Sequence, residues 1–230
     1  MAEAPRETAD SVKLLPLMLV LSASTGLVDA VSVLGFNKVF TANMTGNVVF
    51  LGLAAAGAPG FMPVLYVWAV ATFLAGAVVG GRVGKQAQHM ALGRWLITAS
   101  IVETTLLWIA ALVAAGFDRE AQEPRFSLYA IIALTAVAMG FRNATVRQLK
   151  IPDMTTTVLT LTLTGLAADS ALAGNANPNW GRRISAVTAM FIGAAVGAGL
   201  VFGWGLTPPL LLAGALIMAS TLLCVARLPS

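Results

Sequence analysis

The sequence predicts an all-α integral membrane protein with six transmembrane helices and two short, broken or re-entrant helical segments. The 230 residues are 58% hydrophobic and only 10% charged, and the mean hydropathy is +0.84, which lies outside the range of soluble domains. Six apolar runs reach the roughly 20 residues that are needed to cross the hydrocarbon core of a bilayer. Two further runs are apolar but shorter, and both begin in polar residues.

The six long runs cover residues 14–35, 61–81, 92–116, 126–145, 184–203 and 206–226, and the short runs cover 41–57 and 155–174. The polar tail 1–12 precedes the first run without a small-residue cleavage site, so we expect a retained helix rather than a signal peptide. The one cysteine, Cys224, lies in the last run. This excludes a disulfide framework and a thiolate metal cluster, and we expect no metal site and no cofactor.

An internal repeat divides this single membrane domain into residues 14–116 and 126–226. The segments TGLVDA, NMTGNV and FLAGAVVGG of the first half correspond in order to MGFRNA, DMTTTV and FIGAAVGAG of the second. Repeats of this kind occur in many transporter folds.

The distribution of basic residues favours an inverted arrangement of the two halves. If both short segments re-enter, only Lys38, Arg119 and Arg125 lie on the side opposite the termini, and the acidic stretch DREAQE surrounds Arg119. The positive-inside rule favours this arrangement. The alternative is eight spanning helices in two parallel four-helix repeats, for which Lys and Arg divide about evenly.

The two short segments predict a binding site at the membrane midplane. Each would enter as irregular chain, which is tolerated at depth only where protein or water surrounds it, and return as a half-helix whose first turn presents partial positive charge. Asn, Asp and Thr cap such helix starts, and Gly46 allows close approach. The predicted site for a small polar or anionic solute comprises Asn43, Thr45, Gly46, Asn47, Arg142, Asn143, Asp153, Thr155 and Thr156. The alternative is that these residues only cap and pack two short helices.

Three charged residues fall inside predicted spans, namely Asp29, Glu103 and Arg142. Ionisable groups at this depth are costly, so they pair or line a pathway. Asp29 aligns with Asn143, next to Arg142, and we therefore expect an Asp29–Arg142 pair. Asp29 or Glu103 would bind a coupling ion or proton, with a static ion pair as the alternative.

Glycines recur at the spacing that lets membrane helices touch closely. Gly76, Gly80 and Gly84 lie in one stretch, and Gly193 and Gly197 lie in its repeat mate. We expect these two stretches to contact each other within one chain. A homodimer through Gly76, Gly80 and Gly84 is the alternative.

The runs GLVDAVSVLGF, FTANMTGNVVFLG, MGFRNATVRQL and TTTVLTLTLTGL resemble the YoaK family of bacterial integral membrane proteins, a family defined by a domain of unknown function. Asp29 and the Thr45, Gly46, Asn47 element carry its most specific marks. The resemblance covers residues 14–226 and implies a multi-pass protein of the cell inner membrane, of a kind sometimes described as a small-molecule transporter. Arg142 stands where the family pattern leads us to expect a neutral polar residue such as Gln.

A transporter of a small polar solute is the function that these features predict. A channel, an intramembrane enzyme and a structural membrane protein are the alternatives. We expect no enzyme, because the one histidine, His89, lies in a predicted loop and no metal-ligand spacing such as HExxH occurs. The net charge of +4 does not indicate nucleic acid, because membrane topology already explains the scattered basic residues. The expected partners are the lipid bilayer and the solute.

Overall fold

The computed structural model describes residues 9–149, 159–174, 176 and 179–228. The α-helices within these ranges are α1 (Ala9–Gly35), α2 (Met44–Ala55), α3 (Pro63–Gln86), α4 (Leu92–Ala114), α5 (Arg125–Leu149), α6 (Leu159–Ala168), α7 (Trp180–Trp204) and α8 (Thr207–Val225). Six of them are long and apolar enough to span a membrane, whereas α2 and α6 have only 12 and 10 residues. The predicted all-α fold with six spans and two short helices is confirmed.

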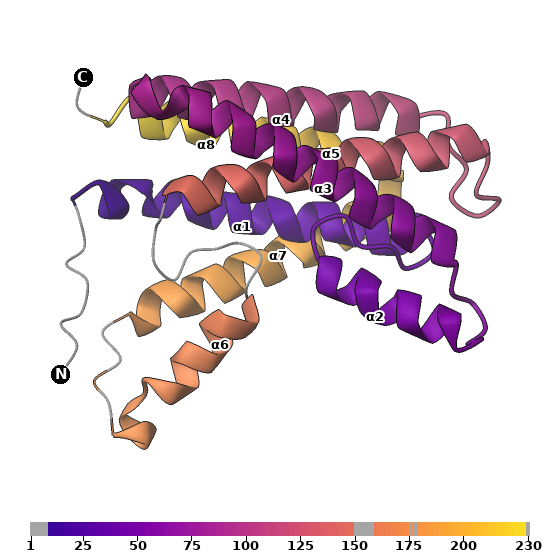
Figure 1. Ribbon diagram of the computed structural model, residues 1–230, viewed down its shortest axis with the longest axis horizontal. Helices are drawn as coiled ribbons and strands as arrows, with labels where there is room; N and C mark the ends of the chain where they lie inside the picture. Colours follow the sequence, from indigo (N-terminus) through magenta and orange to yellow (C-terminus); the bar gives the residue numbers. More distant parts are fainter. Residues whose placement is uncertain (1–8, 150–158, 175, 177–178, 229–230) are drawn as a thin grey trace.

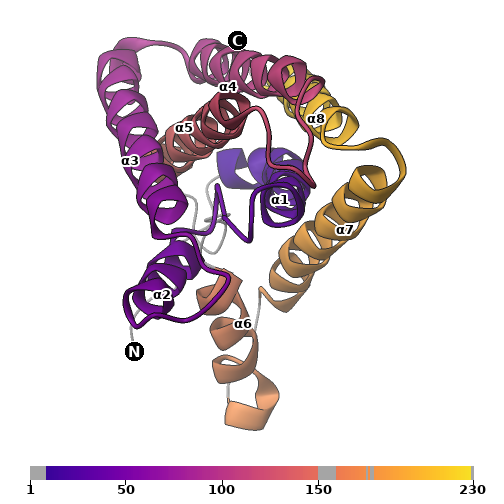
Figure 2. The ribbon, with the colours of Figure 1, turned by 90° about the vertical axis from the view of Figure 1, so that its right-hand side faces the viewer.

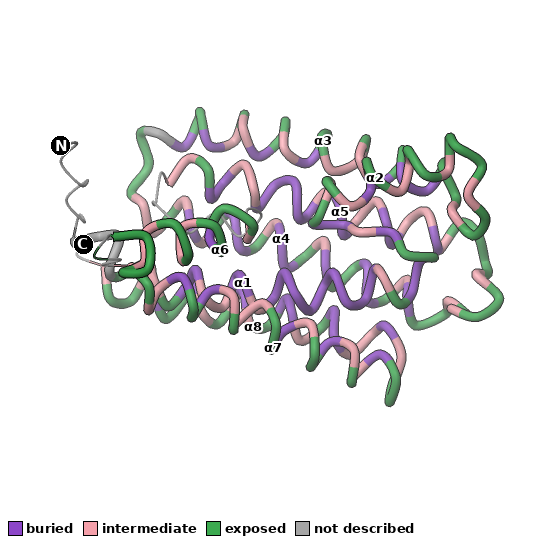
Figure 3. Tube along the Cα trace, turned by 90° about the horizontal axis from the view of Figure 1, so that it is seen from below, coloured by how far each residue is buried: buried purple, intermediate pink, exposed green. Residues whose placement is uncertain are grey.

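Both short helices start part-way along the bundle (Figures 1 and 3). The chain leaves α1, turns back toward the middle, and α2 then runs to the end of the bundle at which α1 finished. The helix α6 starts near the middle as well, but it runs to the opposite end, which also holds the described parts of both termini. Twelve helical residues rise about 18 Å, roughly half the thickness of the membrane. The starts of α2 and α6 therefore face the middle of the bundle from opposite ends.

The helices α1 and α5 form the centre of the bundle, and the other long helices surround them (Figure 2). Helix α1 packs along α7 and α8, and α5 packs along α3 and α4, while α4 also contacts α8. The short helix α2 packs on α3, and α6 packs on α7. The first helix of each half, α1 or α5, therefore packs on the last two long helices of the other half, and the short helix of each half packs on the long helix that follows it. This pattern accords with the internal repeat, which stays a prediction.

Large apolar side chains on the outer helices face the bilayer. Leu74 of α3 is 56% exposed, and Phe191 of α7 is 71% exposed. Their helices have the length and composition of membrane spans. The exposed apolar surface is therefore the surface that contacts lipid.

Glycines allow close helix crossings, but not between the partners that we expected. A Cβ atom added at Gly76 of α3 would strike the backbone of Val137 on α5, and one added at Gly193 of α7 would strike the backbone of Ala23 on α1. The two glycine stretches therefore face α5 and α1, not each other. Gly76, Gly80 and Gly84 are buried inside one chain, which removes the basis for a homodimer through them.

The predicted Asp29–Arg142 pair is wrong, because Arg142 pairs with Glu103. The Nε of Arg142 donates to Oε1 of Glu103, which lies on α4. Its Nη1 donates to the Leu21 carbonyl at 3.1 Å and to Thr25 Oγ1 at 2.8 Å, both on α1. Arg142 and Glu103 are 2% and 4% exposed. This buried pair joins α1, α4 and α5 at the centre of the bundle.

The two ends of the bundle differ in charge. The end with the termini carries Lys13, Arg82, Lys85, Arg94, Arg147, Arg182, Arg183 and Arg227. The other end carries Lys38, Arg119 and Arg125, together with Asp118, Glu120 and Glu123. Backbone N–H groups of Ala121 and Glu120 lower the pKa of the Asp118 carboxyl below its usual value, so this loop keeps its negative charge. The positive-inside rule places the end with the termini in the cytoplasm.

Cysteine labelling in intact cells tests this orientation. In a Cys224→Ala background, we expect an impermeant thiol reagent to modify Glu120→Cys from outside, because Glu120 is exposed in the loop between α4 and α5. Gln86→Cys, at the end of α3, should be modified only after permeabilisation. The reverse pattern would show that the termini lie outside.

Unfolding of purified variants tests the buried pair. Glu103→Gln leaves the Arg142 guanidinium buried without its counter-charge, so we expect the free energy of unfolding to fall by about 3–5 kcal/mol. Adding Arg142→Gln should recover part of this loss, because no buried charge remains. The exposed control Glu120→Gln should change stability by less than about 0.5 kcal/mol. If the effects of the two single variants simply add, the two residues are not coupled.

Candidate functional site

The segment between α1 and α2 returns to the middle of the bundle as irregular chain. It turns at Asn37 and Lys38, whose φ angles of 52° and 65° lie in the left-handed region. The following residues Val39, Thr41 and Ala42 are at most 2% exposed. Irregular backbone at this depth requires hydrogen-bond partners within the protein or in trapped water.

Asp29 and Asn47 supply these partners. The N–H of Ala42 donates to Asp29 Oδ1 at 3.0 Å, and the N–H groups of Thr41 and Asn43 also interact with this carboxylate. The Asn47 side chain pairs with the backbone of Phe40, because its Oδ1 accepts from the Phe40 N–H at 2.9 Å and its Nδ2 donates to the Phe40 carbonyl at 2.6 Å. The segment is thereby fixed between α1 and the first turn of α2.

The start of α2 follows the sequence prediction closely. Asn43 is the N-cap, and its Oδ1 accepts from the Gly46 N–H at 3.3 Å. A Cβ atom at residue 46 would strike the Phe40 ring, so glycine is needed there for close approach. Asn47 differs from the expectation for a ligand-binding residue, since both polar ends of its amide are engaged by Phe40. It positions the segment and leaves Asn43 and Thr45 exposed.

Two adjoining cavities lie at the start of α2 and share Ala42, Asn43 and Thr45 in their lining. The smaller cavity, of about 450 Å³, lies between the starts of α2 and α6. Its described polar lining consists of Thr25, Asp29, Asn43, Thr45 and Thr160. We call this space the midplane cavity.

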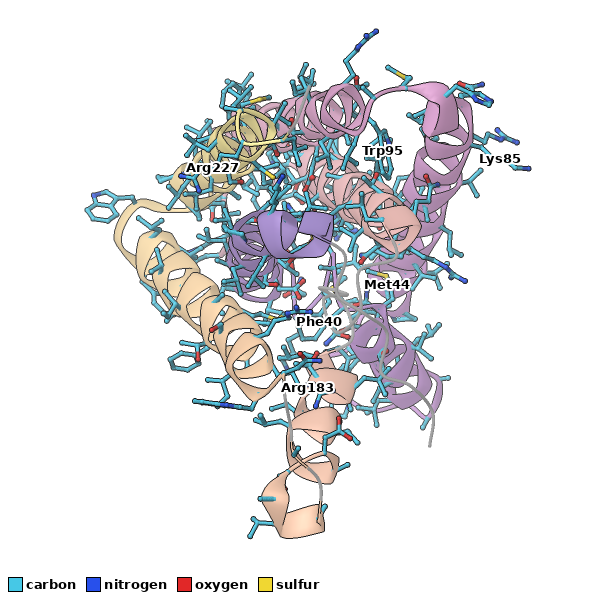
Figure 4. All side chains as sticks on the ribbon, turned by 90° about the vertical axis from the view of Figure 1, so that its left-hand side faces the viewer. Phe40, Met44, Lys85, Trp95, Arg183 and Arg227 are labelled. Carbon is cyan, nitrogen blue, oxygen red and sulfur yellow. The ribbon has the colours of Figure 1, made fainter. Side chains whose placement is uncertain are left out.

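The larger cavity, of about 990 Å³, continues between α3 and α5. Gly81, Arg147 and Gln148 line it, and these residues lie in the last turns of their helices. The larger cavity therefore extends from the start of α2 toward the end of the bundle that holds the termini. Figure 4, seen from that end, places Phe40 and Met44 near the middle of the molecule.

Aromatic side chains pack together around α2, toward the end of the bundle opposite the termini. Phe40, Phe50, Phe61 and Tyr66 form an aromatic cluster with ring centroids 5.3–6.5 Å apart. The Lys38 ammonium lies 5.1 Å from the centre of the Phe61 ring. The turn after α1 also contacts the loop between α4 and α5, since Asn37 Nδ2 donates to Gln122 Oε1 at 3.1 Å. Phe50 of this cluster also lines the midplane cavity, so the cluster borders that cavity along α2.

A buried arginine holds the second short helix. Arg183 of α7 is 8% exposed, and its Nη1 donates to the Gly165 carbonyl and to Asp169 Oδ2, both at 2.6 Å. A Cβ atom at Gly165 would strike the Arg183 guanidinium, so glycine makes room for this contact. Figure 4 shows Arg183 between α7 and α6.

The remaining predicted site residues separate into three groups. Asn143 lines the larger cavity, and its Nδ2 donates to the Met139 carbonyl at 2.9 Å. Arg142 and Glu103 lie outside both cavities and line a separate space of about 30 Å³. Asp153, Thr155 and Thr156 lie outside the described residues.

The sequence prediction missed Thr25 and Thr160, which both line the midplane cavity. Thr25 precedes Asp29 by one helical turn, and residues four apart lie on the same helix face, so this spacing gave a usable signal. Thr160 belongs to a run of alternating Thr and Leu. That alternation spreads the hydroxyls around the helix, and it does not show which one faces the cavity.

Comparison with known proteins agrees with this architecture. Residues 17–223 match the family described as "Protein of unknown function (DUF1275)". Over 153 residues the chain is 30% identical to the UPF0700 transmembrane protein YoaK of Bacillus subtilis (strain 168), and the match covers 66% of this chain and 65% of that protein, somewhat less than two thirds of its length. No solved structure matches the chain. The resemblance indicated by the motifs is confirmed, and the chain, a multi-pass inner-membrane protein, belongs to the DUF1275 family.

Proposed function

We propose that the protein transports a small polar solute across the inner membrane and binds it in the midplane cavity. The observation that carries the proposal is a cavity of about 450 Å³ between the starts of two half-length helices that run to opposite ends of the bundle. In many transporters the solute binds near the bilayer midplane at such interrupted helices. Packing alone does not require a polar cavity at this depth.

The lining indicates the chemistry of the solute. Asn43 and Thr45 are exposed at the start of α2, and Thr160 faces the same cavity from α6. The Thr25 hydroxyl also lines this cavity, but it already donates to the Leu21 carbonyl and accepts from Arg142. Amide and hydroxyl groups both donate and accept hydrogen bonds. The Asp29 carboxylate already accepts from the backbone N–H groups before α2 and adds negative charge. Within the predicted polar or anionic class, this lining favours an uncharged polar solute.

The arrangement also favours a carrier over an open channel. The larger cavity extends toward the end with the termini, while the aromatic cluster packs along α2 on the other side of the midplane cavity lining, to which Phe50 belongs. This is the geometry of a carrier that is open toward the cytoplasm. Transport then requires movement of α2 and the aromatic cluster.

Accessibility of introduced cysteines tests the cavity. In a Cys224→Ala background, Thr45→Cys should react with a charged methanethiosulfonate reagent in inside-out vesicles, because the cavity admits water from the cytoplasmic end. Two controls should stay unreactive, namely the packed Leu107→Cys, at a site with 0% exposure, and the lipid-facing Phe191→Cys. An unreactive Thr45→Cys would mean a dry, packed midplane and would favour a structural role.

Thermal stability of the purified protein can identify the solute. A panel of uncharged polyols, sugars, ureas and amides, with carboxylates for comparison, should contain a compound that raises the melting temperature. Asn43→Ala and Thr45→Val should each weaken its binding about 2- to 10-fold, the value of one neutral hydrogen bond. Thr98→Val, which alters an exposed residue on α4, should not. A compound whose effect survives both cavity variants binds elsewhere, and uptake into proteoliposomes then decides whether the identified solute is transported.

A further inference from the structure

Three of the four buried charged residues described lie at the centre of the bundle, and their charges do not balance; the fourth, Arg183, pairs with the half-exposed Asp169. Asp29, Glu103 and Arg142 are at most 6% exposed, and Arg142 forms its ion pair with Glu103. When all three groups are ionised, one negative charge remains, on Asp29. The Ala42 N–H donates to the Oδ1 of Asp29, and the N–H groups of Thr41 and Asn43 interact with it, but none of them brings a full positive charge. An uncompensated charge at this depth is costly and marks a pathway or a switch.

The surroundings of Asp29 suit both the ionised and the neutral acid. Its carboxylate lines the midplane cavity, which joins the larger cavity at Asn43 and Thr45 and so reaches the cytoplasmic end. Thr41 is 0% exposed, and its N–H interacts with Asp29. Its hydroxyl has no hydrogen-bond partner among the described residues. It offers an acceptor for the proton that a neutral carboxylic acid would carry.

We propose that Asp29 is the proton-binding site of the transporter, and that its protonation releases the segment before α2. One proton from the cytoplasmic cavity adds to the carboxylate, whose net charge changes from −1 to zero. The acid then donates to Thr41 Oγ1 and accepts the N–H groups of residues 41–43 more weakly. Because Asn43 begins α2 and lines the midplane cavity, the same event alters the solute site. The inference rests on the proposed transport function and adds the coupling ion to it.

Few other charged groups act on Asp29. Arg142 of α5 attracts the Asp29 carboxylate electrostatically without contacting it, and the ion pair with Glu103 of α4 offsets the charge of Arg142. The lining contributed by α2, the described part of α6, and α7 carries no ionisable side chain, and Arg147 of α5 faces only the larger cavity. Among the described residues no group of three or more His, Cys, Asp or Glu side chains could hold a metal ion.

Infrared spectroscopy of the protein in liposomes tests proton binding without any solute. From about pH 9 to pH 5, the wild type should gain the C=O stretch of a carboxylic acid, and this band should shift in D2O because Asp29 exchanges its proton with the cavity water. Asp29→Asn should lose this band, and Asp29→Glu should retain a titrating band at a shifted frequency. Glu120→Gln should leave the band unchanged. Absence of the band from the wild type, or its persistence in Asp29→Asn, would overturn the proposal.

Coupling is tested in inside-out vesicles by the reactivity of Thr45→Cys relative to that of Gln86→Cys, an exposed site at the cytoplasmic end of α3, because this ratio cancels the general pH dependence of thiol labelling. The ratio should change several-fold between acid and neutral pH and should be independent of pH in Asp29→Asn. A ratio that responds to sodium at constant pH, but not to pH, would replace the proton by a metal ion and overturn the proposal. If Thr45→Cys reacts but the wild type shows no Asp29 band, only the proton site is wrong. If Thr45→Cys does not react, the transport proposal is wrong.

Discussion

The structure depends on satisfying a stretch of non-helical backbone in the middle of a membrane bundle. Residues 40–42 lie between α1 and α2 and lack the regular hydrogen bonds of a helix, and water in the bilayer core is absent unless a cavity admits it. Asp29 and Asn47 supply acceptors and donors from the two helices that flank the segment. Their contacts determine where α2 begins and therefore where the midplane cavity lies. Asp29 and Asn47, two of the residues that carry the family resemblance, are thus first of all supports for the backbone.

The rest of the bundle provides a rigid frame for this segment. Close crossings at Gly76 and Gly193 bring α3 against α5 and α7 against α1, and the buried Glu103–Arg142 pair joins α1, α4 and α5. By contrast, α2 and α6 each pack mainly on one long helix. Elements with fewer buried contacts open at lower free energy than the core. The short helices are accordingly the elements that can move while the frame stays fixed.

A carboxylate that supports the backbone and also faces a cavity links two properties of the protein. The hydrogen bonds between Asp29 and the backbone before α2 are stronger when Asp29 is ionised, because an ionised acceptor forms stronger hydrogen bonds than a neutral one. Its protonation state and the position of α2 are therefore coupled by direct contact. No longer pathway through the protein is required for this coupling.

The sequence by itself determined the membrane class, the six spans and the two short helices, because hydrophobic length and polar interruptions depend on local composition alone. It also determined the start of α2, since an N-cap such as Asn43 acts within one turn. The YoaK-like motifs gave the family for the same reason, as they are continuous in the chain.

Only the tertiary structure decided which partners these residues meet. Arg142 pairs with Glu103 and not with Asp29, because the packing of α4 against α5 brings Glu103 alongside. The Asn47 amide turns toward the Phe40 backbone, a contact set by the path of the irregular segment. The two glycine stretches meet α5 and α1 because the central helices lie between them. Each of these contacts depends on the relative placement of segments distant in sequence, which local patterns do not specify.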